Sequence, residues 1–283
     1  MNEQNPNSPI PPQPPGRPSG VGATPPRIPP GSWAGYQAAP EPLGTNPVER
    51  TPIQGVIGAV EAILRQPRRV MFQMKQPNAG GLIISLLAIA VVCSLVYGVV
   101  VGTFSGAQQY WAAPVKIACG MLISALICLP SLYIFACLSG SQARLAEMFG
   151  LVAGLMALLT VLLIGFAPVA WVFSESTHSV VVMGSLHLAF WFVAAIFGLR
   201  FLHAAFCHLN AKTSGGFQVW VAIFLLVALQ MTTALRPLVG KSDRFLPAAT
   251  EKKFFVQHWL DCVATDPTWN ETPPKTPRQD AQN

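Results

Sequence analysis

Few side chains in the long apolar middle of this chain can do acid–base chemistry, and His187 is the one set well inside an apolar run. Buried acids are the usual mark of proton or cation coupling in membrane proteins, and none of the five long apolar runs contains Asp or Glu. Trp191 follows His187 by one helical turn. We expect a neutral imidazole that hydrogen-bonds to a neighbouring helix, with a ligand or proton-relay role as the alternative.

Two further groupings contain residue types that can bind metals. Arg200, His203 and Cys207 share one helical face through their i, i+3, i+7 spacing, and Glu175 and His178 lie close together. One His and one Cys without a second pair make a poor metal site, and basic side chains at helix ends reach toward lipid headgroups. We therefore expect no metal and no cofactor, and interpret Arg200 and His203 as headgroup contacts.

The sequence signatures of common enzymes are missing. No Ser nucleophile elbow, HExxH, P-loop or Rossmann glycine pattern occurs, and the six cysteines form no CxxC. Five cysteines lie in or near apolar runs, which is typical of packing residues. The sixth, Cys262, is expected to face an oxidising compartment, either buried or paired between chains. The pattern predicts a protein that is not an enzyme.

Charge is distributed very unevenly along the chain. Between Gly81 and Leu235 only six of 155 residues are charged: Lys116, Arg144, Glu147, Glu175, Arg200 and Lys212. The whole chain is 11% charged, whereas about a quarter is usual in soluble domains. A net charge of +6 would suit nucleic acid, but the Lys and Arg residues flank apolar segments, which is the pattern of membrane topology. The expected solvent is lipid, and nucleic-acid binding is not indicated.

Five apolar runs are long enough to cross a bilayer, which takes roughly 20 helical residues. They are Leu82–Thr103, Val115–Leu138, Phe149–Phe173, Val180–Leu199 and Phe217–Leu235, and the fourth is expected to continue toward His208. Barrel strands would alternate apolar and polar residues, which these runs do not. We predict an all-α membrane protein with five transmembrane helices over residues 82–235.

The flanking regions differ from this core. Residues 1–50 are proline-rich and are predicted to be a disordered cytosolic tail. Apolar residues at helical spacing over 51–76, interrupted at Pro67, predict amphipathic interfacial helices that begin with Thr51 as N-cap. A helix packed on the protein's own loops is the alternative. Residues 236–283 are predicted to be an extracytoplasmic tail with a short amphipathic helix.

The basic residues predict a direction of insertion. Eight flank one side of the five runs, namely Arg50, Arg65, Arg68, Arg69, Lys75, Arg144, Arg200 and Lys212. Four flank the other side, namely Lys116, Arg236, Lys241 and Arg244. Since Lys and Arg are enriched in cytoplasmic loops, we expect a cytoplasmic N-terminus and an extracytoplasmic C-terminus.

Small residues indicate where helices approach one another closely. Gly98, Gly102 and Gly106 repeat at four-residue spacing in the first run, and Gly150 and Gly154 do so in the third. We expect them to pack helices within one chain or between chains. Glycine is also simply frequent in membrane helices, which is the alternative.

The layout resembles the Yip family (Ypt-interacting-protein-like), particularly its bacterial members. The resemblance rests on the proline-rich tail, a short amphipathic helix reaching Pro67-Arg68-Arg69, and closely spaced spans. Leu235-Arg236-Pro237-Leu238-Val239-Gly240 is also similar to a segment of uncharacterised bacterial multipass proteins. The eukaryotic motif DLYGP is absent, so the resemblance implies no role with Rab GTPases. It implies a bacterial inner (plasma) membrane protein and no catalytic residues.

These features predict a non-enzymatic membrane protein that scaffolds or organises a membrane assembly. Its expected partners are the lipid bilayer and either itself or other membrane proteins, with no small-molecule substrate indicated. The alternative is a channel or transporter subunit without proton coupling. That alternative is motivated by kinks expected at Pro130 and Pro168 and by the polar residues Gln230 and Thr233.

Overall fold

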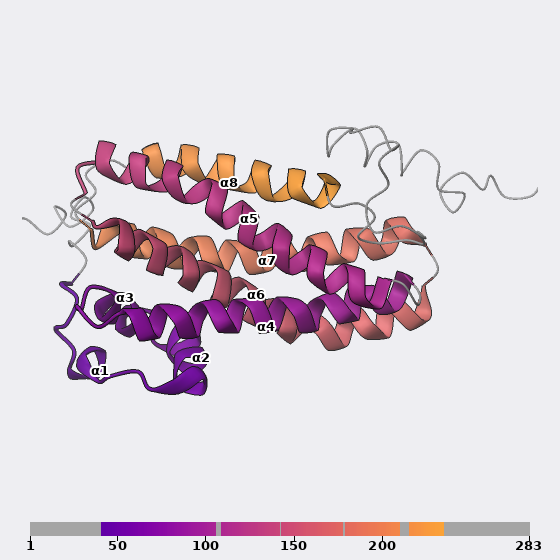
Figure 1. Cartoon of the computed structure of the whole chain (residues 1–283), viewed down its shortest axis with the longest axis horizontal. Coiled ribbons are helices and arrows are strands. Elements are labelled where there is room, and N and C mark those ends of the chain that lie inside the picture. Colours follow the sequence, from indigo (N-terminus) through magenta and orange to yellow (C-terminus); the bar gives the residue numbers. More distant parts are fainter. Residues whose placement is uncertain (1–40, 106–108, 142, 178, 210–214, 235–283) are drawn as a thin grey trace, which may run out of the picture. The chain divides into compact units, whose positions relative to one another are not determined.

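The computed structural model describes residues 41–105, 109–141, 143–177, 179–209 and 215–234, all within the unit that begins at Pro40 (Figure 1). Every regular element in these ranges is a helix, which confirms the all-α prediction. The helices are α1 (Pro47–Arg50), α2 (Gly55–Arg65), α3 (Pro67–Met74), α4 (Gly80–Ser105), α5 (Gln109–Leu138), α6 (Leu145–Ser176), α7 (Val180–Cys207) and α8 (Gly215–Ala234).

Four of these helices are long and apolar enough to cross a membrane. The segments are Gly80–Thr103, Trp111–Leu138, Leu145–Ser176 and Val181–Cys207. The fourth runs on to Cys207, with His208 as its C-cap, as the sequence predicts. The fifth expected span corresponds to α8, whose apolar stretch Gly215–Met231 is shorter than the other four. The structure thus describes a multipass helical membrane protein, and membrane crossing by α8 remains a prediction.

The centre of the bundle is α6. It packs mainly against α4 and α7, with further contacts to α5, α2 and α3, and residues 150–160 are all buried. A helix that is apolar all round needs neighbours or lipid on every side, and here protein surrounds its first half. The second half, around Pro168, is more exposed.

The fifth apolar helix is attached through α5. As Figure 1 shows, α5 lies along α4 at one end and reaches α8 at the other, and it contacts both helices. At the α8 end the indole Nε1 of Trp220 donates a hydrogen bond of 2.9 Å to the carbonyl of Cys128 in α5. The ring of Phe217 lies 5.1 Å from that of Phe206 in α7. Aromatic side chains therefore fill the space between α5, α7 and α8.

The N-terminal region differs from expectation in two ways. Residues 41–50, predicted to belong to the disordered tail, form a turn followed by α1, which Asn46 caps through its side chain. The next helix begins at Gly55 rather than after Thr51, and Thr51 is instead the C-cap of α1. The reason is tertiary, because side chains of α3 bind the backbone of residues 51–53 and hold it extended. The helix does end before Pro67, as predicted.

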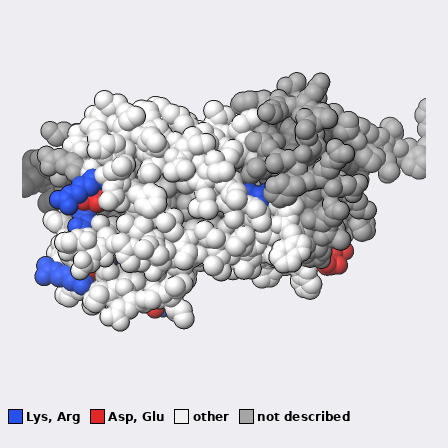
Figure 2. Space-filling model, viewed as in Figure 1, with Lys and Arg blue, Asp and Glu red and all other residues white. Residues whose placement is uncertain are grey.

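Charged side chains gather at one end of the bundle. Figure 2 shows most of the basic residues of this face at the end where α1 and α3 lie, while the described sides of the long helices are almost free of charge. The exposed side chains along these sides include Ile84, Leu126 and Phe197. This distribution fits helices whose outer surfaces contact lipid.

Candidate functional site

Among the described residues, Tyr97 of α4 and His187 of α7 form a polar pair deep among apolar side chains. The hydroxyl oxygen of Tyr97 lies 2.7 Å from Nδ1 of His187. The two rings meet edge to face, with centroids 5.6 Å apart and planes at 89°. The structure thus brings His187 to a hydrogen-bond partner on another helix, as the sequence predicts.

The surroundings of this pair are apolar. Tyr97 is only 4% exposed and belongs to a buried cluster with Leu163 and Ala167 of α6 and Ala194 of α7. The pairing of Tyr97 with His187 could have been found by comparing how far each residue lies from the nearest terminus of its helix. Tyr97 lies eight residues before the end of α4 and His187 lies seven residues after the start of α7, and these two helix termini lie at the same end of the bundle (Figure 1).

The second ring nitrogen of His187 is not satisfied by the contact with Tyr97. Its Nε2 is buried and has no hydrogen-bond partner within the described part of the chain. If the Tyr97 hydroxyl donates to Nδ1, Nε2 carries a proton and is an unsatisfied donor. If Nδ1 donates instead, Nε2 is an unsatisfied acceptor. An unmet buried polar atom costs about 1–3 kcal/mol, so Nε2 of His187 is a costly atom to keep inside the bundle.

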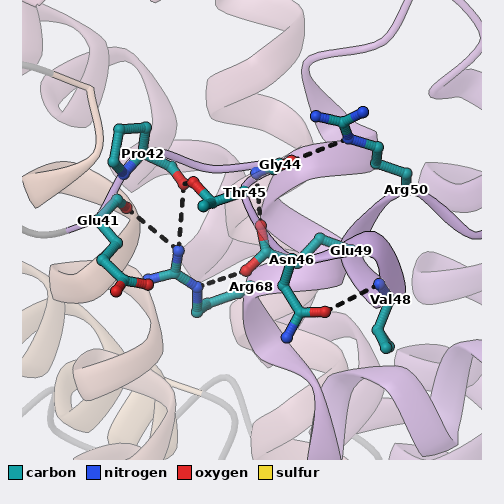
Figure 3. A network of polar contacts seen from close by, with 9 residues as sticks. All are labelled: Glu41, Pro42, Gly44, Thr45, Asn46, Val48, Glu49, Arg50 and Arg68. Carbon is teal, nitrogen blue, oxygen red and sulfur yellow. Dashed lines mark hydrogen bonds and ion pairs between the residues drawn. The ribbon is translucent and has the colours of Figure 1, made fainter.

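The second polar feature lies at the end of the bundle that carries α1 and α3. Glu49 of α1 is 5% exposed and accepts hydrogen bonds from Nε of Arg68, at 2.6 Å, and from the amide of Gly44 (Figure 3). The Nη2 of Arg68 also donates to the carbonyls of Glu41 and Pro42. Burial alone raises the pKa of the Glu49 carboxyl, but these bonds and the positive charge of Arg68 outweigh it and lower the pKa below its usual value.

Gly44 is required at its position for two reasons. Its φ of 89° lies in the left-handed region that favours glycine. A Cβ added there would also lie 2.6 Å from Cε2 of Phe72. A glycine at position 44 therefore lets the turn place its amide on the Glu49 carboxylate without backbone strain and without a clash with Phe72.

The same contacts continue along residues 41–54, which we call the strap. Arg69 of α3 donates from Nε to the carbonyl of Thr51 and from Nη2 to that of Pro52, both at 3.0 Å. The Oε1 of Gln73 accepts from the amide of Ile53 at 2.9 Å. The side chains that hold the strap are thus Arg68, Arg69 and Gln73, all from α3. Each is committed to a backbone or carboxylate partner, which makes the network a structural clamp.

The helix-packing glycines contact neighbours in the same chain. A Cβ added at Gly98 would lie 2.4 Å from Cα of Pro114 in α5. At Gly154 it would lie 2.9 Å from Cε1 of Phe201 in α7, and at Gly150 it would lie 3.2 Å from Cδ1 of Ile83 in α4. Gly102 is buried in α4, and Gly106 lies outside the described residues.

The remaining candidates are spread over several places. Gln230 is half-buried in α8, and the side chain of Thr233 lies outside the described part, as do His178 and Cys262. Arg200, His203 and Cys207 are exposed along one side of α7. The described ranges contain no group of three or more His, Cys, Asp or Glu side chains that could hold a metal ion.

Comparisons with known proteins add no identity to this description. No family model matches the chain, and no match was found among curated proteins or among solved structures. The class that the fold defines is a multipass helical membrane protein, and the resemblance to the Yip family stays a prediction.

Proposed function

We propose that this chain is a non-enzymatic scaffold of the membrane, one that organises an assembly of membrane proteins or of its own copies. In this proposal all five long helices span the bilayer, because α8, with 20 residues, reaches about 30 Å at 1.5 Å per residue. The N-terminus is cytoplasmic and the C-terminus extracytoplasmic. The amphipathic α2 and α3 lie at the cytoplasmic interface of a bacterial inner membrane.

The observation that carries the proposal is how seven Ser and Thr side chains of the long helices are satisfied. Their hydroxyl groups donate to carbonyls three or four residues earlier in the same helix, rather than converging on a common path. These residues are Ser85, Ser94, Thr103, Ser124, Ser131, Thr160 and Ser185. Together with the apolar burial around α6, this favours a packed bundle whose role is structural.

The test is the state of the full chain in its own membrane. Extraction in native nanodiscs followed by native mass spectrometry should give a complex that contains a second copy or another membrane protein. A monomer that retains no protein partner would refute the scaffold. The glycines at positions 98, 150 and 154 are already in contact within one chain, so the association must use other faces.

The orientation has its own test. Positive charge at the α1–α3 end, as seen in Figure 2, supports placing that end in the cytoplasm. A periplasmic reporter enzyme fused after Asn283 should be active, and a fluorescent reporter that folds only in the cytosol should be dark at the same position. The opposite pair of results would reverse the orientation.

A channel or transporter subunit without proton coupling is the second candidate. The specific observation in its favour is the buried, unpartnered Nε2 of His187, since polar atoms left unmatched within a membrane often serve function. Solute flux into liposomes that disappears on Gln230→Leu or His187→Phe, while the variant stays folded, would favour this candidate over the scaffold.

A further inference from the structure

The surface of α2 has three distinct sides, which only the folded structure separates. One side is buried and consists of Ala59, Ala62 and Ile63, each at most 1% exposed. A second side is apolar but open and consists of Val56, Leu64 and Ile57, of which Ile57 is 86% exposed. The third carries Glu61 and Arg65, which form an exposed ion pair at 3.5 Å.

Helix geometry explains the division. At about 100° per residue, the buried residues and the open apolar residues occupy adjacent sectors of the helix, and the ion pair occupies the remaining one. In the sequence the two apolar sectors merge into one broad stripe. In the structure one sector packs on the bundle, whereas the other stays open, with Val56 and Leu64 about half exposed and Ile57 almost fully exposed.

The position of α2 along the bundle sets its depth. It packs against α4 and α6, and the side chain of Met74, the last residue of α3, extends along α6. The Cε of Met74 would lie 3.4 Å from a Cβ at Gly154, which is about 13 Å along α6 from its first residue, at 1.5 Å per residue. With its contacts to α4 and α6, α2 therefore lies beside the apolar part of α4 rather than beyond its end (Figure 1).

The chemistry of the open side identifies what covers it. Val56, Ile57 and Leu64 are aliphatic, whereas the energetic centres of protein interfaces favour Trp, Tyr and Arg. The helix on which α2 packs exposes the same kind of surface, with Ile84 of α4 at 69%. The ion pair beside the open side suits the headgroup level, where a polar edge stays hydrated.

We propose that the open side of α2 is embedded in the acyl chains of the cytoplasmic leaflet, with Ile57 as its most exposed residue and the Glu61–Arg65 pair at the headgroups. The helix thus occupies area in one leaflet as a wedge fixed to the bundle. This inference rests on the proposed placement of the long helices in the membrane.

The test is photocrosslinking of the full chain in vesicles of phosphatidylethanolamine and phosphatidylglycerol. p-Benzoylphenylalanine is placed singly at Ile57, at Glu61 and, as a lipid-facing reference, at Ile84. Intact-mass measurement after irradiation should show lipid adducts at positions 57 and 84, each several-fold more abundant than at 61. Leu64 serves as a second site on the open side.

The outcomes separate two failures. Lipid adducts at 84 but not at 57 or 64 would overturn the embedding of α2 while leaving the bundle in the membrane. Adducts at none of these positions would overturn the membrane placement itself. In cell membranes, a protein adduct at 57, whether to a second copy or to another chain, would replace lipid with a protein partner and overturn the proposal.

Discussion

Replacing Gly98 by Ala tests the closest helix contact of the bundle. The added Cβ would lie 2.4 Å from Cα of Pro114, whereas carbon atoms in ordinary contact lie about 3.5–4.0 Å apart. The obstacle is backbone, so no side-chain rotation relieves it. The axes of α4 and α5 must separate by about 1 Å, and that separation loosens the packing around Tyr97 and Val101, which are buried in the same stretch of α4.

The magnitude follows from two opposing effects. Overpacking costs about 1–3 kcal/mol, and a backbone obstacle places this case in the upper part of that range. Ala favours a helix over Gly by at most about 1 kcal/mol. We expect Gly98→Ala to lower the free energy of unfolding by about 1–2 kcal/mol, a factor of 5–30 in the unfolding equilibrium.

Gly165→Ala is the matched control. Gly165 is exposed on α6, and a Cβ added there meets nothing within 4 Å. Unfolding of the purified chain in mixed micelles with rising dodecyl sulfate, followed by circular dichroism, should shift to less dodecyl sulfate only for Gly98→Ala. If both variants unfold at the same fraction of dodecyl sulfate, or if Gly98→Ala is the more stable variant, the close approach of α4 and α5 is refuted.

Three further predictions concern single polar contacts. Glu49→Gln should speed amide exchange in the strap. Because the pKa of Glu49 is lowered in the fold, its carboxylate stabilises the strap above the usual carboxyl pKa. Wild-type protection should be lost as the pH falls through the lowered pKa, whereas the variant should show no such step. Tyr97→Phe should cost about 0.6–1.7 kcal/mol, and a double-mutant cycle with His187→Phe should return that value as coupling; additive effects would mean that the 2.7 Å contact contributes nothing. Trp220→Phe should cost about 1 kcal/mol by removing the hydrogen bond to Cys128, and an unchanged unfolding midpoint would contradict that bond.

The sequence by itself determined the helical class and the membrane setting. Only six charges in 155 residues indicate a lipid setting, because about a quarter of the residues of soluble domains is charged. In lipid, backbone groups must satisfy one another within helices. Local rules also placed the end of α2 before Pro67 and the continuation of α7 to Cys207.

Local rules failed where distant residues compete for the backbone. Thr51 and Pro52 read as a helix start, but the guanidinium of Arg69 and the amide of Gln73 take the backbone groups of the strap, so the helix begins later. Order within residues 41–50 likewise depends on Arg68, nineteen positions beyond Glu49. Nothing in a window of the sequence shows such a partner.

Only the tertiary structure decided how chemically similar surfaces are used. Periodicity marks Ala59 and Ile57 of α2 alike as apolar, yet one is fully buried and the other is 86% exposed, because α4 and α6 cover just one side. Gly98 could have faced another copy and instead meets Pro114 of its own chain. The type of a residue determines whether it tolerates lipid, water or a packed neighbour. The segments that the fold brings within a few ångströms determine which of these surroundings the residue has.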